Sequence, residues 1–203
     1  MTRIGRQIAH FEHIDLSSVD ALFSSDRRYR FRLTVEFRDT LLDSGRAESL
    51  AVILKNPSAA DARMADATIR KVETFVFHRF SDVRRLHILN LFGLRATDPV
   101  DLNRVFHEEG AMAVIGVEND HFIRATLADS AFIIAAWGNS SGIDRVLYDE
   151  RIFRVKQLLG EFSARKLFTV RGEKRTKQPL HGLMWGYDYE IAPMETGTNP
   201  EDA

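Results

Sequence analysis

The chain has 203 residues, enough for one domain with a full hydrophobic core and too few for two domains of ordinary size. Hydrophobic residues make up 44% and charged residues 28% of the sequence, which excludes disordered, collagen-like and membrane-embedded classes. The formal net charge of −1 gives no overall attraction to nucleic acid, and the lack of cysteine excludes disulfides, thiolate zinc sites and cysteine nucleophiles.

The predicted elements begin with a short helix capped by Ser17 or Ser18. Residues 29–37 alternate apolar and polar side chains, which predicts a half-exposed antiparallel strand at the edge of a sheet. Continuous apolar runs follow, and such runs suit strands that are covered on both faces, as in parallel sheets. These runs are residues 50–54, 86–89, 131–136 and 167–170.

Stretches with helical spacing separate these strands, at residues 66–80, 119–127 and 143–159. The alternation of strand and helix predicts an α/β fold with right-handed crossovers. We expect a three-layer sandwich, with a central, mainly parallel four-stranded sheet between helices and an N-terminal antiparallel edge strand. The single domain is expected to cover residues 1–192, with a disordered tail at 193–203.

The sequence also bears on where the protein works. No apolar run approaches the roughly 20 residues that span a bilayer. The basic N-terminus lacks the apolar core of a secretory signal. We therefore expect a cytoplasmic protein with no membrane partner.

Polar or glycine-rich sequence follows every predicted parallel strand. In such folds ligands bind beyond the carboxyl ends of the strands, so we expect these loops to share one site. Taken singly, each motif has a plainer explanation, such as a turn at 56–58, a packed indole at Trp137, or a buried Asn90 that bonds backbone groups. The candidate site residues are Asn56, Pro57, Ser58, Asp61, Asn90, Phe92, Arg95, Trp137, Gly138, Asn139 and His181.

A basic run follows the last predicted strand. Arg171, Lys174 and Arg175 there are candidates for contacts with a nucleic-acid backbone, although short runs of this kind often form only a solvated loop. The sequence has no phosphate-binding loop, dinucleotide-binding turn, zinc-protease histidine pair or serine-hydrolase elbow. It supports no cofactor and no metal site, and it leaves metal dependence open.

Several short motifs together resemble, in order and spacing, a bacterial and phage family called domain of unknown function 1643. The resemblance extends over residues 29–183. Two positions depart from the usual pattern of the family, because Lys55 replaces a leucine and Gly182 replaces a proline. The matching segments are 54–61, 66–70, 90–92, 95–99, 136–138 and 181–183.

The layout also resembles, more distantly, the uracil-DNA glycosylase superfamily. Those enzymes carry an Asn-Pro motif, a Leu-Asn pair, a Trp-Gly pair and a histidine loop after successive strands of a parallel sheet. Asn56, Asn90, Trp137 and His181 occupy these places here. The resemblance implies a crevice that acts on or binds a nucleobase, nucleotide or nucleic acid, with DNA or a nucleotide as the partner.

If the protein is an enzyme, this resemblance implies a hydrolase of N-glycosidic bonds. Asn56 would hold the water and His181 would donate to the departing base, while Phe92 would stack on the base and Asn90 would read its edge. An amide is no strong base, so the activity should be modest. The alternatives are a non-catalytic nucleotide or nucleic-acid binding module, another reaction on a nucleobase, and an interaction protein without a ligand. The substrate and the oligomeric state stay open.

Overall fold

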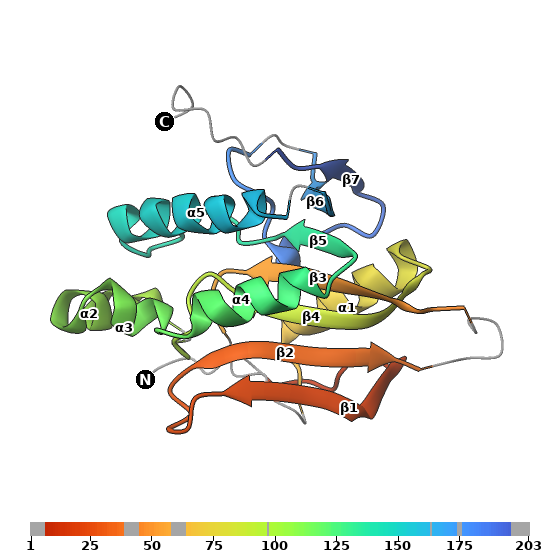
Figure 1. Ribbon diagram of the computed structural model, residues 1–203, viewed down its shortest axis with the longest axis horizontal. Helices are drawn as coiled ribbons and strands as arrows, with labels where there is room; N and C mark the ends of the chain where they lie inside the picture. The colour runs from red at the N-terminus through yellow and green to blue at the C-terminus, as the bar shows by residue number, and fades with distance from the viewer. Residues whose placement is uncertain are drawn as a thin grey trace.

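A computed structural model describes residues 7–38, 45–57, 64–96, 98–162, 164–173 and 176–195. These residues form one mixed sheet with the strand order β1-β2-β4-β3-β5-β6-β7 and helices on both of its faces (Figure 1). The strands are β1 (Ile14–Phe23), β2 (Arg30–Phe37), β3 (Glu48–Leu54), β4 (Val83–Asn90), β5 (Phe132–Ala135), β6 (Lys166–Arg171) and β7 (Glu190–Pro193). The helices are α1 (Ala67–Arg79), α2 (Pro99–Glu109), α3 (Ala111–Ile115), α4 (Asn119–Ala128) and α5 (Arg145–Gly160), with a 3-10 turn η1 (Gly182–Met184).

The predicted mixed α/β class is confirmed, but the sheet is larger than predicted. Neighbouring strands β4, β3, β5 and β6 pair in parallel in its centre. The β1–β2, β2–β4 and β6–β7 pairs are antiparallel, which makes the sheet seven-stranded. The prediction that residues 29–37 form the edge strand was wrong, because β2 lies between β1 and β4.

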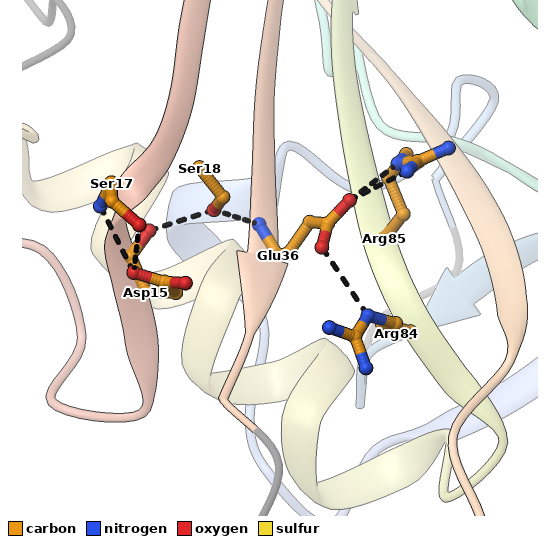
Figure 2. Close-up of polar contacts among 6 residues, drawn as sticks. All are labelled: Asp15, Ser17, Ser18, Glu36, Arg84 and Arg85. Carbon is orange, nitrogen blue, oxygen red and sulfur yellow. Dashed lines mark hydrogen bonds and ion pairs between the residues drawn. The ribbon is translucent and has the colours of Figure 1, made fainter.

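The segment around Ser17 and Ser18 is a bulged strand, and the predicted helix cap was wrong. The register of β1 on β2 shifts between Asp15 and Asp20. Ser18 Oγ donates to Asp15 O (2.7 Å) and accepts the Glu36 N–H (2.8 Å), so a side chain stands in for a ladder carbonyl at this bulge (Figure 2). Serine hydroxyls form hydrogen bonds with nearby backbone groups both in helix caps and in bulges. The local sequence is therefore compatible with a helix cap and with a bulged strand.

Two apolar cores lie on opposite faces of the sheet. Val52 and Leu54 of β3 face α1, whereas Ala51 and Ile53 face the layer of α2, α4 and α5. Side chains that are covered on both faces account for the continuous apolar run of β3. No helix within the described ranges is long and apolar enough to cross a membrane.

The sheet extends into the segment predicted to be a tail. Pro193 of β7 is paired with Phe168, and the Met194 N–H donates to Leu167 O (3.0 Å). The C-terminal boundary of the ordered sheet therefore lies beyond residue 192. Residues 196–203 lie outside the described part of the chain.

Candidate functional site

Main-chain hydrogen bonds join the segments that follow the parallel strands into one edge. We call this edge the rim and define it as residues 55–57, 91–96, 136–139 and 179–182. Because the parallel strands end together, the loops after β3, β4 and β5 meet at the rim, and the segment before η1 lies across them. The bonds run from Leu91 N to Leu54 O, Phe92 N to Lys55 O, Gly138 N to Pro179 O and Gly182 N to Ala136 O, over 2.9–3.3 Å.

His181 lies at the rim in direct contact with Gly138. A Cβ atom on Gly138 would stand 2.8 Å from His181 Cβ, and the φ of +72° at this position also favours glycine. His181 Nδ1 accepts the Leu183 N–H (3.3 Å) as the cap of η1. The neutral ring therefore carries its proton on Nε2.

The environment of His181 keeps its ring neutral. Burial is the main cause, and the positive charge of Lys55 adds to it, while Asp66 acts in the opposite direction. Together they lower the pKa of His181 to about 4. At neutral pH the ring thus provides an uncharged Nε2–H donor.

Lys55 is a buried cation of the rim, and the sequence prediction did not include it among the site residues. Its side chain is buried, at 8% exposure, and its Nζ lies 5.8 Å from the centre of the Tyr148 ring. No carboxylate pairs with it among the residues that the structure describes. Burial lowers the pKa of Lys55. The sequence did contain a signal for Lys55 as a site residue, because this lysine directly follows the apolar run of β3.

Buried side chains hold the Trp137-Gly138 turn in place. Tyr148 on α5 donates its hydroxyl to Gly138 O (2.6 Å). Trp137 is fully buried and donates Nε1–H to Gln178 Oε1 (3.2 Å), which anchors the segment that leads to His181. Trp137 therefore has the packed-indole role that the sequence left as an alternative, and it supports the site without facing a ligand.

Asn90, the last residue of β4, is fully buried, and neither its Nδ2 nor its Oδ1 has a hydrogen-bond partner in the part of the chain that the structure describes. It is paired in register with Leu54 of β3, so the two side chains lie on the same face of the sheet. Gly182 packs on Leu54, since a Cβ there would lie 3.1 Å from Leu54 Cδ2. The unpaired amide of Asn90 thus lies on the side of the rim where the His181-Gly182 segment packs.

Asn56 has an oriented side-chain amide. Its Nδ2 donates to Ala96 O (2.6 Å), which leaves Oδ1 as a hydrogen-bond acceptor on a half-buried side chain. Such an oxygen can hold a water molecule or accept from a ligand. Pro57 is buried beside it, whereas Ser58 and Asp61 lie outside the described residues.

Side chains from α4 and α5 fix the start of the loop after β4. Asn119 Nδ2 donates to both Asn90 O and Leu91 O (3.1 Å each). Arg151 Nε donates to Leu91 O (2.6 Å), and its Nη1 pairs with Asp120 (2.6 Å). These buried supports were missed in the sequence, because nothing local to Asn119 or Arg151 indicates contact with β4.

Three other candidates lie in the rim segments, but their side chains are either buried in the core or exposed. Phe92 is fully buried in the core on the α5 face, so its ring offers no stacking surface. Arg95 is exposed and extends toward the β1–β2 turn, where its guanidinium lies 5.0 Å from the Phe23 ring. Asn139 is exposed, next to Gly138.

Arg171 lines a groove of about 900 Å³ beside β6 and β7, which adjoins the rim at Pro179 and Leu180. The charged residues of this groove have both signs, so it is not a basic patch. They are Lys156, Arg171, Glu173, Lys177, Asp188, Glu190 and Glu195. Lys174 and Arg175 lie outside the described residues, and their contact with a nucleic-acid backbone stays a prediction. Within the described ranges, no group of three or more His, Cys, Asp or Glu side chains could hold a metal ion.

Replacing Asn90 tests whether its amide is kept for a ligand. We expect Asn90→Leu to raise the free energy of unfolding by about 1–3 kcal/mol, because it removes an unsatisfied buried amide and retains a similar volume. Urea unfolding measures the change. The matched control is Asn119→Leu, which should destabilise the protein because it removes donors to Asn90 O and Leu91 O. A loss of stability in Asn90→Leu would mean that the amide has a structural role.

Comparison with known proteins gives a family but no activity. Residues 30–183, which include every segment of the rim, match the family described as protein of unknown function (DUF1643). No curated protein and no solved structure matches the chain. The chain therefore belongs to the DUF1643 family.

Proposed function

We propose that the rim binds a nucleobase, either free or within a nucleotide or DNA, and that Asn56 and His181 act on its N-glycosidic bond. The observation that carries the proposal is the buried amide of Asn90, which has an unused donor and an unused acceptor. Nucleobase edges present donors and acceptors side by side, and asparagine pairs with them through both of its side-chain atoms. A base that met both atoms would offset the cost of burying them. Because Asn90 is fully buried, the base would reach them only when the His181-Gly182 segment that packs on this face moves aside.

The chemistry follows from two further side chains of the rim, those of Asn56 and His181. Cleavage of an N-glycosidic bond places negative charge on the departing base, and a fixed donor in a buried site stabilises that charge. The neutral Nε2–H of His181 is such a donor. Asn56 Oδ1 can orient the attacking water but cannot take its proton as a strong base, so a modest rate is expected.

The resemblance to the uracil-DNA glycosylase superfamily supports this proposal. The loops that carry Asn56, Asn90, Gly138 and His181 follow the parallel strands in the order that this resemblance implies. The parallel pairing of β4, β3, β5 and β6, with helices on both faces, also suits the three-layer layout of those enzymes.

A base-release assay tests the catalytic part of the proposal. The substrates are single- and double-stranded oligonucleotides that contain uracil, a thymine mismatch or a modified pyrimidine. We expect release by the wild-type protein and a rate lower by about tenfold or more in Asn56→Ala, a loss of at least about 1.4 kcal/mol of transition-state stabilisation. The control is Asn139→Ala, which truncates an exposed asparagine of the same rim and should leave the rate unchanged.

The alternative is a non-catalytic module that binds a nucleotide or nucleic acid. It is favoured by the composition of the rim segments, which contain no aspartate or glutamate. If no substrate in the panel loses its base, hydrolysis of these substrates is excluded. Equilibrium binding of the same oligonucleotides would then support the non-catalytic module. Binding that is absent even at low salt would exclude both functions.

A further inference from the structure

Lys55 differs from the other buried cations of the described chain in having no partner for its charge. Arg46 donates to the carbonyls of Phe77, Phe80 and Val83. Arg151 pairs with Asp120 and donates to Leu91 O. Among the described residues, Lys55 makes neither a hydrogen bond nor an ion pair, and its charge lies beside the ring of Tyr148. Its side chain is largely buried and this burial lowers its pKa, so a charge kept here without a counter-ion is costly and needs a reason.

The charge of Lys55 is directed at the same part of the rim as His181. Lys55 Nζ lies 5.8 Å from the centre of the Tyr148 ring, and the Tyr148 hydroxyl donates to Gly138 O (2.6 Å). Gly138 in turn is in direct contact with His181, and the charge of Lys55 disfavours the protonated form of the His181 ring. Asp66 acts on His181 but not detectably on Lys55, whose pKa is lowered by burial alone. The Asp66 carboxylate is also occupied, because its Oδ1 accepts the Ile69 N–H (2.8 Å) as the cap of α1. Asp66 therefore does not neutralise Lys55.

Two donors thus lie on the same part of the rim without an acceptor among the described residues, the Lys55 ammonium and the His181 Nε2–H. A group that satisfies both must carry acceptor oxygens and negative charge. Phosphate esters have this chemistry, and a buried ammonium binds them through charge-assisted hydrogen bonds.

We propose that Lys55 binds a phosphate oxygen of the ligand, so that the rim takes a phosphorylated nucleobase compound in preference to a free base or nucleoside. This inference rests on the proposed function for the nucleobase part and on Lys55 for the phosphate part. The phosphate belongs either to a mononucleotide or to a nucleic-acid strand.

Calorimetric binding at low salt tests the proposal with four kinds of probe. These are 2′-deoxynucleosides, the matching 5′-monophosphates, a single-stranded oligonucleotide that contains all the bases, and inorganic phosphate. The variant is Lys55→Met, which keeps the length of the side chain and removes its charge. The matched control is Lys166→Met, because Lys166 also lies over an aromatic ring, that of Phe132 at 5.0 Å, but at the start of β6 and so at the opposite end of the parallel strands.

We expect the wild-type protein and Lys166→Met to bind the monophosphates about tenfold or more tightly than the nucleosides. Lys55→Met should lose this preference and retain the affinity for nucleosides. Tighter binding of the oligonucleotide than of any monophosphate would place the phosphate in a strand, and the reverse would place it in a mononucleotide. An unchanged preference in Lys55→Met would overturn the proposal.

The two proposals fail in different ways. If nucleosides and monophosphates bind equally well, the phosphate inference is wrong and the nucleobase proposal stands. If inorganic phosphate binds in a manner that needs Lys55 while no nucleoside or nucleotide binds, the nucleobase proposal is wrong. Titration of the Lys55 side chain by NMR gives a second measurement, because bound phosphate should raise its pKa toward the ordinary value, and no change at saturating phosphate would contradict the inference.

Discussion

Glu73→Ala is expected to lower the free energy of unfolding by about 3–5 kcal/mol, because it breaks a hydrogen-bonded pair that is sealed from water. Glu73 on α1 and His10 have fully buried side chains, with His10 Nδ1 2.6 Å from Glu73 Oε1. The second carboxylate oxygen accepts the Phe11 N–H (2.9 Å). The alanine variant leaves that N–H without its acceptor and opens a cavity beside α1. Urea unfolding measures the loss.

The control for Glu73→Ala is a carboxylate pair at the surface. Glu109 pairs with Arg28 at 2.8 Å, and the two side chains are 44% and 37% exposed. Glu109→Ala should therefore cost less than about 1 kcal/mol. If Glu73→Ala also cost less than about 1 kcal/mol, the segment of His10 and Phe11 would not dock on α1 in solution.

The central strands could be predicted because burial on both faces leaves a continuous apolar run, as in β3 and β4. The strand β1 could not be predicted, because the bulge at Ser17 and Ser18 interrupts the alternation of apolar and polar side chains on which a strand prediction relies. α2 was missed although Asp98 caps it and Pro99 begins it, a pair of signals that the sequence does contain. Leu102, Val105 and Phe106 also have helical spacing, so the sequence carried this signal for α2 as well.

The sequence predicted those parts of the candidate site that depend on which loops follow the parallel strands. Asn56, Asn90 and His181 follow or face strand ends, and the parallel topology brings their segments to one edge. Lys55 was missed although it follows the apolar run of β3 without a break, and its neighbour Tyr148 of α5 is distant in sequence. Phe92 was chosen for its aromatic ring, but the same ring favours burial in the core.

The free energy of unfolding should fall as the pH is lowered from about 7.5 to about 5, and two histidines should cause most of the loss. Burial, followed by the charges of Arg32 and Arg85, lowers the pKa of His87 to about 4. Burial, followed by the charge of Lys55, lowers that of His181 to about 4. In the unfolded chain both rings take up a proton near pH 6.5. Between these values the unfolded state binds more protons, so acid favours unfolding, and the loss from these rings ends near pH 4.

Each ring should contribute about 2 kcal/mol over this range, or about 4 kcal/mol together, and His181→Gln or His87→Gln should each remove roughly half of the pH dependence. The carboxyl groups of lowered pKa stay ionised above pH 5 and add little. They are Asp15, Asp26, Glu36 and Glu161.

NMR titration of the ring resonances measures the two pKa values directly. A ring that titrated near pH 6.5 would be solvated and would contribute nothing to the pH dependence of the free energy of unfolding. That result would contradict the burial of this histidine. His181 also links stability to the proposed binding, and a nucleoside is the suitable probe because, unlike a phosphate monoester, it does not titrate near pH 6. Nucleoside binding that uses the His181 Nε2–H should stay constant from about pH 8 down to about pH 5 and change only when the ring gains a proton near pH 4. A change in binding near pH 6.5 that disappeared in His181→Gln would show that the ring is not neutral by burial.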